Sequence, residues 1–305
     1  MEKDKLGDWR KELTTEEIVP EKAGKVTIVM GWVEEIRDLG GIKFFNLQDS
    51  TGKVQITAPE KKVEQAILDK IDSLSKESSI AVKGEITEAD QAPGGVEIIP
   101  EEIRVLNPAS TPLPLDPTGR TKADLDTRLD ARLLDLRRPK PSSIFKIKSL
   151  ILQTFREELT ERNFTEVNTS KIVGSATETG ASLFPVQYFD REAFLSQSPQ
   201  LYKEILTGGF EKLFEIGHIF RAEEHDTRYH LNEVISADIE MAFAKKEDVM
   251  EVLEDLIVAI FDRVKNDASK QLEIMEHDFE VPEKPFTRLT YEEAIEKVKN
   301  AGEDI

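Results

Sequence analysis

The segment KLFEIGHIFRAEEHDTRYHLNEVISADIEMAFA, residues 212–244, decides the fold of the second half of the chain. Both of its ends alternate apolar with polar residues, and strand side chains alternate between the two faces of a sheet. We therefore expect an antiparallel hairpin with one buried face, formed by Phe214, Ile216, His218, Phe220, Ile235, Ala237, Ile239, Met241 and Phe243. The other face would carry charge, from Glu215, Arg221, Glu223, Asp238 and Glu240.

Two long amphipathic helices are expected on either side of this hairpin in the sequence. Residues 142–163 place an apolar stripe at helical spacing, with Ser142 or Ser143 as the N-cap. Residues 245–270 repeat such a pattern. Helices and strands do not alternate one by one, so an α+β domain with helices packed on an antiparallel sheet is predicted rather than a doubly wound fold.

The first third of the chain has a different pattern. Residues 25–106 predict five short strands, with one helix after the third, which is typical of a Greek-key β-barrel of the OB-fold type. Residues 107–120 contain four prolines and no regular period, as expected of a linker. We therefore predict a multi-domain chain with an OB-fold domain at 1–106, a hinge at 107–140 and the α+β domain at 141–305.

Composition narrows the class of protein. The 305 residues are 39% hydrophobic and 33% charged, and they include no cysteine, which excludes disulfides and thiolate chemistry. No apolar run could span a bilayer and no signal peptide is visible, so we expect a cytoplasmic protein with no membrane partner. The net charge of −19 argues against general nucleic-acid binding, but residues 137–148 carry five basic residues and no acid.

The polar tip of the hairpin suits a nucleotide. The guanidinium of Arg221 offers a rigid fork of donors for phosphate, and the carboxylate of Glu223 can accept a hydrogen bond from an exocyclic amine. The alternative is a solvated hairpin, in which cross-strand ion pairs are each worth less than about 1 kcal/mol.

Two further segments are candidates. Ser198 can cap a helix that starts at Pro199 and places Gln200 and Lys203 on one face, although an ordinary amphipathic first turn has the same pattern. The loop GSATETGASLFPV, residues 174–186, has the composition of a lid or of a plain connector.

Together these segments resemble the class II aminoacyl-tRNA synthetases, most closely the archaeal-type aspartyl-tRNA synthetases. FRAEEHDTRYHLNE (220–233) resembles motif 2, and LTERNFTEVNTSKIV (159–173) resembles motif 1, a helix and strand at a dimer interface. ATETGASLF (176–184) and QSPQLYKE (197–204) resemble the aspartate-binding segments. PLPLDPTGRTKADLDTRLDARLLDLRRP (112–139) resembles the hinge. The resemblance implies an OB-fold anticodon-binding domain and a class II catalytic domain.

The resemblance implies a reaction as well. ATP and aspartate, with Mg²⁺, would give aspartyl-adenylate, and the aspartyl group would pass to tRNA(Asp). Arg221 would hold the α-phosphate and the substrate carboxylate as the catalytic residue. The implied ATP-binding residues are Arg221, Ala222, Glu223, Tyr229, His230 and Leu231. The implied aspartate-binding residues are Glu178, Ser198, Gln200, Leu201, Tyr202, Lys203 and Arg221. A cation at Lys203 favours aspartate over asparagine as the substrate.

In the barrel, the resemblance assigns the tRNA anticodon to four residues. Phe44 would stack on a base and Gln55 would contact the central one, while Trp32 and Gln91 would influence whether tRNA(Asn) is accepted beside tRNA(Asp). Gln91 stands where tolerant relatives are expected to have lysine, which leaves the acceptance of tRNA(Asn) open. Without the resemblance, a place in the barrel core would be the ordinary role of Phe44 and Trp32.

The chain departs from the family pattern at three places. Tyr229 stands where motif 2 normally has arginine, which here is one position earlier, at Arg228. Ser170 replaces the usual proline of motif 1 at the expected homodimer interface. Motif 3 and the family's magnesium ligands are absent, so we expect a catalytic domain that is incomplete at its C-terminal end, with no metal ligand to assign.

Two other functions fit parts of this pattern. A non-catalytic tRNA-binding fragment would bind tRNA without forming adenylate, and an asparagine-specific relative of the same class would share the catalytic motifs. Some asparagine-making relatives lack an anticodon barrel, against which residues 25–106 argue. Aspartate–tRNA ligase is therefore the function predicted.

Overall fold

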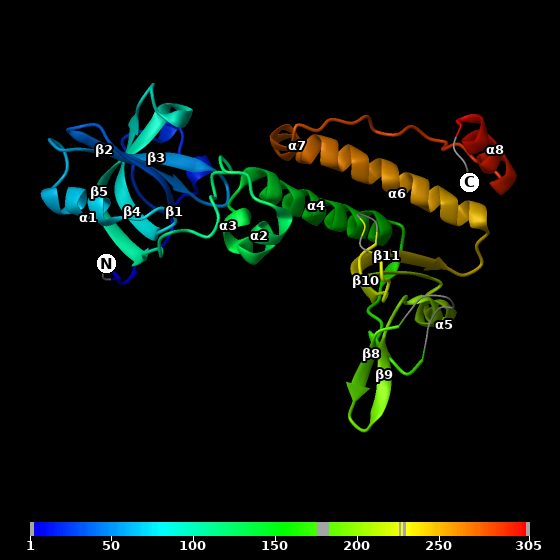
Figure 1. Ribbon diagram of the computed structural model, residues 1–305. Helices are drawn as coiled ribbons and strands as arrows, with labels where there is room; N and C mark the ends of the chain where they lie inside the picture. Colours follow the sequence, from blue (N-terminus) through cyan, green and yellow to red (C-terminus); the bar gives the residue numbers. More distant parts are fainter. Residues whose placement is uncertain (1–2, 176–182, 226, 228–229, 303–305) are drawn as a thin grey trace. The chain divides into compact units, whose positions relative to one another are not determined.

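The computed structural model describes residues 3–175, 183–225, 227 and 230–302. The chain divides into two compact units, Met1–Asp135 and Leu136–Ile305. Figure 1 shows the order of the elements along the chain. No helix among these described residues is long and apolar enough to cross a membrane.

The first unit is built on a five-stranded closed barrel, which confirms the predicted OB-fold. Its strands are β1 (Val26–Asp38), β2 (Ile42–Gln48), β3 (Lys53–Pro59), β4 (Ser79–Glu88) and β5 (Val96–Asn107), in the order β1-β2-β3-β5-β4. Helix α1 (Gln65–Ser73) follows the third strand, as predicted. All neighbouring strands are antiparallel except β3 and β5, which pair in parallel and close the barrel.

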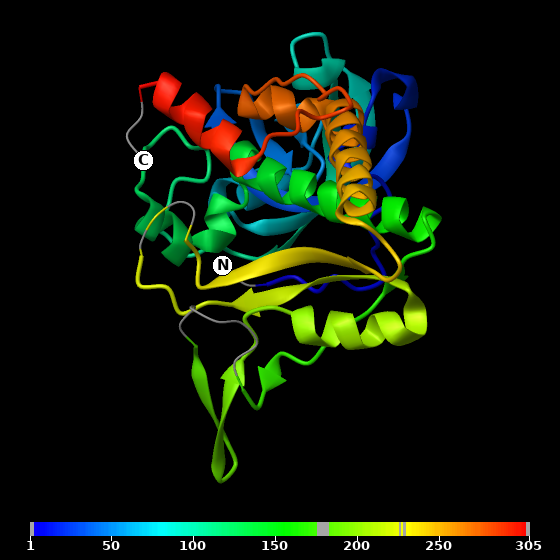
Figure 2. The same cartoon turned by 90° about the vertical axis from the view of Figure 1, so that its right-hand side faces the viewer.

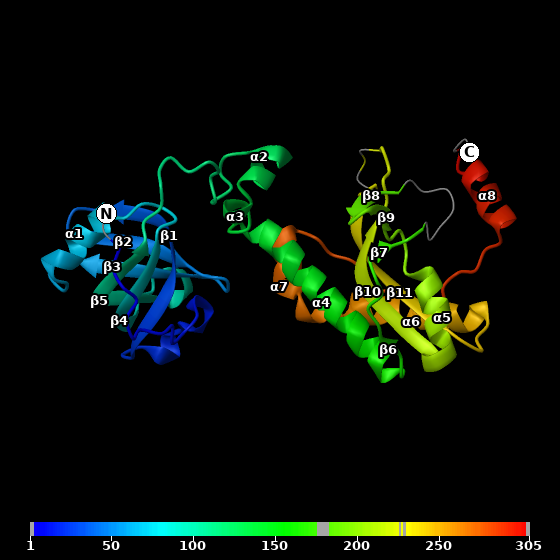
Figure 3. The same ribbon diagram turned by 90° about the horizontal axis from the view of Figure 1, so that it is seen from below.

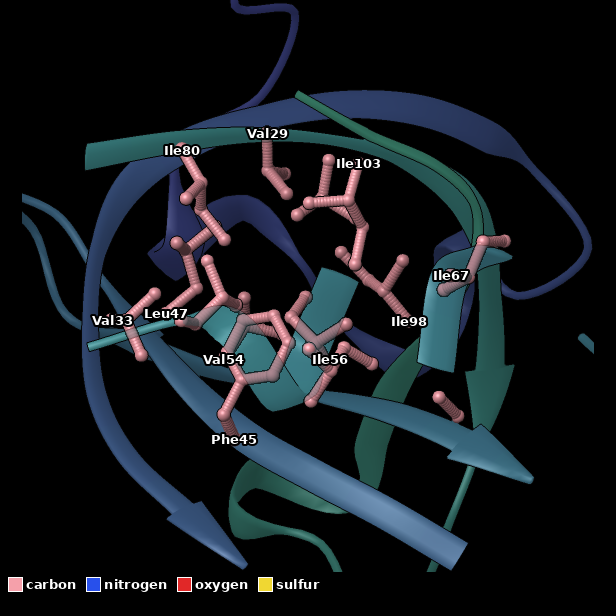
Figure 4. Packing of buried hydrophobic residues seen from close by; sticks show 14 of the residues in the cluster. Val29, Val33, Phe45, Leu47, Val54, Ile56, Ile67, Ile80, Ile98 and Ile103 are labelled. Carbon is pink, nitrogen blue, oxygen red and sulfur yellow. The ribbon is translucent and has the colours of Figure 1, made fainter. Parts of the chain in front are cut away.

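Alternate residues of these strands fill the barrel, although β3 and β4 each bury three residues in succession. In β2, for example, Phe45 and Leu47 are fully buried while their neighbours are partly exposed. Figure 4 shows Phe45, Ile56 and Ile98 meeting in the barrel interior with side chains from the other strands and from α1. Burial of this apolar set contributes most of the unit's stability, at about 25 cal/mol per Å² removed from water.

The segment before the barrel is fixed to it by a buried carboxylate. Asp49, at the β2–β3 turn, accepts hydrogen bonds from Lys11 Nζ at 2.5 Å and from the backbone N–H of Thr15 at 2.9 Å. It also accepts from the Thr51 hydroxyl at 2.7 Å. Burial alone would raise the pKa of Asp49, but these donors outweigh it and hold the pKa well below its ordinary value of 3.8.

A short helical segment ends the first unit. It follows the proline-rich stretch and consists of α2 (Leu125–Asp130) and α3 (Arg132–Asp135). The α3 carboxylate of Asp135 is fully buried and accepts hydrogen bonds from Arg128 Nε at 2.8 Å and Arg132 Nη1 at 2.7 Å. These two arginines fix the turn that leads into the second unit's sequence.

The second unit packs two long helices on one face of a sheet. The sheet has the order β11-β10-β6, from β6 (Thr165–Glu166), β10 (Lys212–Phe220) and β11 (Glu233–Met241). Helices α4 (Pro139–Glu161) and α6 (Lys246–Asp267) lie side by side on it (Figure 1). The predicted α+β class is confirmed, but the sheet is mixed, because β6 runs parallel to β10.

The remaining elements surround that sheet. A second small sheet has the order β7-β9-β8, from β7 (Ile172–Val173), β8 (Pro185–Tyr188) and β9 (Arg191–Leu195). Its β8–β9 hairpin extends away from the rest of the unit (Figure 2). Helix α5 (Gln200–Phe210) lies beside β10 and β11, as Figure 3 shows. Helices α7 (Ser269–Met275) and α8 (Tyr291–Asn300) follow α6.

The predicted start of the first long helix was wrong. Neither Ser142 nor Ser143 caps it: α4 begins at Pro139, with Arg138 at the N-cap position. Proline is favoured at the first helical position because its missing N–H would be unbonded there in any case. The Ser143 hydroxyl instead donates to the Pro139 carbonyl at 2.8 Å, inside the first turn.

Candidate functional site

The hairpin of β10 and β11 separates an apolar face from a charged face. Phe214 pairs with Ile239, and both belong to the core under α4 and α6. On the opposite face Glu215 pairs with Asp238. The predicted apolar face is buried only over part of its length, because Ile235 remains 36% exposed. Phe243 is 97% exposed, since it lies beyond the end of β11 with a left-handed φ of 57°.

A buried lysine occupies the charged face. Lys203, in the first turn of α5, is 3% exposed. Its Nζ lies 3.3 Å from Asp238 Oδ1 and 3.5 Å from Glu240 Oε2, both on β11. Gln200 Nε2 also donates to Glu240 Oε2, at 3.2 Å. One cation therefore faces two carboxylates and the Ile239 carbonyl, which lies 3.5 Å from the same Nζ. All three contacts are longer than the 2.7–2.9 Å typical of charge-assisted hydrogen bonds.

The turn before α5 is positioned by serines. The predicted start of this helix was one residue early, because α5 begins at Gln200 with Pro199, not Ser198, at the N-cap position. The Ser198 hydroxyl still accepts the Gln200 N–H, at 3.0 Å. Ser196 donates its hydroxyl to the Ser198 carbonyl at 2.9 Å. The Ser196 carbonyl accepts the Phe220 N–H at 2.9 Å. These bonds bring the start of α5 and the end of β10 together.

The polar tip follows directly from β10. The Arg221 N–H donates to the Asn232 carbonyl at 3.0 Å, which extends the hairpin by one residue, and Arg221 is half-buried. The Glu223 N–H donates to the Arg221 carbonyl at 2.9 Å. This bond between residues two apart bends the backbone, so Arg221 and Glu223 are not successive members of one strand face, as simple alternation would have placed them.

A histidine extends the tip. His230 Nδ1 is 2.6 Å from the Thr227 hydroxyl, and its Nε2 is 3.6 Å from Glu223 Oε2. The rings of His225 and His230 are 5.2 Å apart. The two rings are tilted by 60° and are therefore not stacked. A carboxylate beside aromatic rings at a strand end is a suitable surround for an aromatic base with an exocyclic amine.

Other residues named from the sequence are placed differently. Leu201 and Tyr202 are exposed on α5, away from the buried side of Lys203, and Leu231 is exposed after the tip. Ala222 is half-buried between Arg221 and Glu223. Glu178, Arg228 and Tyr229 lie outside the described residues.

Asp238 and Glu240 were missing from the predicted site residues. The alternation on β11 had placed both carboxylates on the charged face, but no sequence signal linked them to Lys203. Ser236 shares that face and donates its hydroxyl to Asp238. In the β10–β11 pairing Asp238 lies opposite Glu215, on the face of the sheet that Lys203 of α5 contacts.

The outer face of the barrel carries the other candidates. Phe44 on β2 pairs with Thr57 on β3, and Gln55, two residues from Thr57 on the same face, pairs with Asn46. Gln55 Nε2 donates to Thr57 Oγ1 at 3.0 Å and to Glu97 Oε2 at 3.2 Å. The Arg37 guanidinium is 6.0 Å from the Phe44 ring centroid.

The structure therefore brings an aromatic ring and an oriented amide together on the outer face, and Phe44 is not a core residue. Trp32 is half-buried on the adjacent strand β1, opposite Gln48, and Gln91 is exposed in the β4–β5 loop. An aromatic surface beside fixed polar groups is the usual arrangement for unpaired bases.

Within the described part of the chain, no group of three or more His, Asp or Glu side chains could hold a metal ion. The residues on the charged face thus do not fit a resident metal site. Their side chains combine the cations of Arg221 and Lys203 with the carboxylates of Asp238 and Glu240.

Two family descriptions match the sequence. "tRNA synthetases class II (D, K and N)" matches residues 124–304, and "OB-fold nucleic acid binding domain" matches residues 26–106. These ranges contain the hairpin with α5 and the barrel face, respectively.

Similar proteins cover almost the whole chain. An "Aspartate--tRNA(Asp/Asn) ligase" of Methanopyrus kandleri is 52% identical over 97% of this chain and 69% of its own length. One of Methanothermobacter thermautotrophicus is 54% identical over 97% of this chain and 68% of its own.

Solved structures are similar too. Asparaginyl-tRNA synthetase from Pyrococcus horikoshii, complexed with asparaginyl-adenylate, has a TM-score of 0.89 and 35% identity, over 97% of this chain and 68% of that one. Aspartyl-tRNA synthetase from Entamoeba histolytica has a TM-score of 0.79 and 30% identity, over 95% and 63% of the two chains.

Proposed function

Because the chain belongs to the class II tRNA synthetases of the D, K and N group, we propose that it activates aspartate with ATP and transfers the aspartyl group to tRNA(Asp). The family implies an aminoacyl-tRNA synthetase that uses ATP, an amino acid and tRNA. Aspartate is our choice among the amino acids of the group. It rests on the residues of the charged face and on the names of the relatives.

The observation that carries this choice is the buried cation at Lys203. An ammonium group has three donors, and the two carboxylates beside Lys203 hold it only through long contacts of 3.3 and 3.5 Å. A substrate carboxylate could therefore make a closer contact with the same Nζ. A neutral amide would gain far less from a desolvated cation, which favours aspartate over asparagine.

The remaining charge fits the rest of the amino acid. The group of Lys203, Asp238 and Glu240 has a net charge of −1, which suits a ligand that also carries an ammonium group. We assign Ser198, Gln200, Leu201, Tyr202, Lys203 and Arg221, with Glu178, to aspartate. Of these residues, Ser198, Gln200 and Lys203 lie together at the start of α5.

The ATP half would form around Arg221. In adenylate formation the α-carboxylate of aspartate attacks the α-phosphorus and pyrophosphate leaves, so the catalytic need is for alignment and for donors to the phosphoryl oxygens. We assign Arg221 to the α-phosphate and Glu223 to the adenine amine. Ala222, Tyr229, His230 and Leu231 are assigned to line the nucleotide. Mg²⁺ would arrive with ATP, and no residue is assigned to it and no step is derived through it.

The barrel would read the anticodon. We propose residues 1–106 as the anticodon-binding domain, 107–140 as the hinge and 141–305 as catalytic domain. Phe44 would stack on a base, and Gln55 would present its carbonyl oxygen, because Thr57 and Glu97 already bond its Nε2. Trp32 and Gln91 would bear on the choice between tRNA(Asp) and tRNA(Asn).

We extend the proposal to tRNA(Asn) as a second substrate, since the relatives are named for both tRNAs. We also propose a cytoplasmic homodimer that uses the motif 1 segment around Ser170.

The test is transfer of labelled aspartate to tRNA(Asp) and tRNA(Asn) transcripts by the purified chain. Acid-precipitable label on tRNA(Asp) is expected, and label on tRNA(Asn) would establish the second substrate. Charging with labelled asparagine instead would replace aspartate by asparagine in the proposal. Binding of tRNA with no charging of either kind would leave the chain as a tRNA-binding protein.

A further inference from the structure

A second buried charge lies on the same face of the sheet as the proposed site, and no role has been assigned to it above. Glu215, in the middle of β10, is 1% exposed. Its Oε1 accepts the Thr169 N–H at 3.0 Å and lies 2.7 Å from Lys171 Nζ. Its Oε2 accepts the Thr169 hydroxyl at 2.7 Å. Burying a carboxylate is costly unless it is paired and hydrogen-bonded, as Glu215 is here.

The next residue on that face leaves space for the ion pair. A Cβ atom at Gly217 would lie 3.0 Å from Glu215 Oε1 and 3.3 Å from Lys171 Nζ. Any other amino acid would therefore press on both charged atoms. Glycine at 217 therefore leaves both charged side-chain ends where they are, whereas a larger residue would require each to shift by a few tenths of an ångström.

The segment held by Glu215 also contacts the residues proposed to bind substrate. The Lys171 carbonyl accepts the Ser196 N–H at 2.9 Å, and the Ser196 carbonyl accepts the Phe220 N–H at 2.9 Å. Residues 169–171 are thus attached to β10 twice, directly at Glu215 and through Ser196 at Phe220. The second attachment lies beside Arg221 and, through Ser196 and Ser198, beside the start of α5.

From this closed set of contacts we propose that Glu215 is a positioning residue: by clamping Thr169 and Lys171 to β10, it fixes Ser196 and hence the relative placement of Ser198, Lys203 and Arg221. The inference rests on the proposed function for what those three residues bind. The clamp itself is a property of the fold and can be tested without any substrate.

A purely structural ion pair and a positioning clamp have different consequences. Loss of a structural pair would weaken the whole β10–β11 ladder evenly. Loss of the clamp would release the Ser196 and Phe220 amides first, because their hydrogen bonds depend on where residues 169–171 lie.

Hydrogen exchange of the purified chain, followed by NMR, separates the two. The variants are Glu215→Gln and Lys171→Met, and the matched control is Glu166→Gln. Glu166 forms an ion pair with Arg156 at 3.0 Å from the neighbouring strand β6, without touching residues 169–171. Lys171 is partly exposed, so the Lys171→Met variant decides the question if Glu215→Gln does not fold.

We expect at least a tenfold loss of protection at the Ser196 and Phe220 amides in both clamp variants, with protection retained at Phe214 and in Glu166→Gln. Unchanged protection at Ser196 and Phe220, or an equal loss along all of β10, would overturn the proposal.

Binding of a non-hydrolysable aspartyl-sulfamoyl adenosine gives the functional readout. Because misplacement by about 1 Å can cost two orders of magnitude, we expect both clamp variants to bind it ten- to a hundredfold more weakly than wild type, and Glu166→Gln to bind it normally. Wild-type affinity in the clamp variants would contradict the positioning role. If the wild-type chain does not bind the analogue, the proposed function fails, and the exchange experiment still decides whether the clamp exists.

Discussion

Replacing Lys203 by methionine tests how the chain would choose its amino acid. Methionine has a similar length and keeps the apolar contacts of the stem, so the change removes mainly the charge. At about 4 Å and an effective dielectric of 20, a lysine–carboxylate contact is worth about 4 kcal/mol. Asp238 and Glu240 already neutralise part of the positive charge of Lys203. We therefore expect a net loss of about 2–3 kcal/mol in aspartate recognition, or about 30- to 150-fold in kcat/KM.

The substitution should also cost some stability. Without the cation, Asp238 and Glu240 face each other on β11 with side chains about a quarter exposed. Removing one partner of a fully buried ion pair costs about 3–5 kcal/mol, so a partly exposed pair should lose about 1–2 kcal/mol. Thermal unfolding measured beside the kinetics shows whether the variant is folded at the assay temperature.

The assay is ATP–pyrophosphate exchange with aspartate and with asparagine in parallel. The matched control is Lys246→Met, which removes an exposed lysine from α6. Exchange with aspartate should fall in Lys203→Met, exchange with asparagine should change less than threefold, and the control should behave as wild type. An unchanged kcat/KM for aspartate in a folded Lys203→Met variant would refute the assignment of Lys203 to the substrate.

Three further predictions concern the barrel and the nucleotide. Phe44→Ala should weaken tRNA binding by about 1–3 kcal/mol without changing the melting temperature of the barrel. Phe45→Ala, on the buried face, should instead lower the free energy of unfolding by about 3–5 kcal/mol. Wild-type tRNA affinity in Phe44→Ala would rule out stacking at Phe44. Asp49→Asn should lower the free energy of unfolding by about 2 kcal/mol at neutral pH. Because the folded-state pKa of Asp49 is depressed, the stability that this carboxylate contributes is present above pH 3.8 and is lost as the pH falls below that value. The free energies of unfolding of the wild type and of Asp49→Asn should therefore converge in acid. A constant difference between them down to pH 2 would contradict this. Glu223→Gln keeps an acceptor oxygen but removes its charge, so it should weaken the hydrogen bond from the adenine amine by about 1 kcal/mol, raise the KM for ATP about fivefold and leave the KM for aspartate unchanged; the reverse pattern would place Glu223 on the amino-acid side.

Patterns with a fixed period were predictable from the sequence. Alternation predicted the buried face of β10 around Phe214 and Ile216, and the spacing of apolar residues predicted α4 and α6, because these features follow from local geometry alone. The charged face beneath α5 was visible on β11 for the same reason. On the apolar face, the predicted burial of Ile235 and Phe243 was too high, because alternation does not show how far the covering helices extend along the strand.

Contacts between distant segments were not predictable in this way. The pairing of Lys203 with Asp238 and Glu240 depends on where α5 lies, and the parallel placement of β6 beside β10 depends on the long connection through α5 and the small sheet. The clamp of Glu215 on Lys171 joins residues 44 apart in sequence, and each alone resembles an ordinary surface charge on a strand. The bend at Arg221 and Glu223 is a local hydrogen bond that alternation does not anticipate.

The central claim is that this chain activates aspartate with ATP. Aspartate-dependent ATP–pyrophosphate exchange by the purified wild-type chain, with asparagine as the parallel substrate, tests it most directly. We expect exchange with aspartate, and at most a few per cent of that rate with asparagine. Exchange with asparagine at an equal or higher rate, or no exchange with either amino acid from a folded chain that binds tRNA, would contradict it.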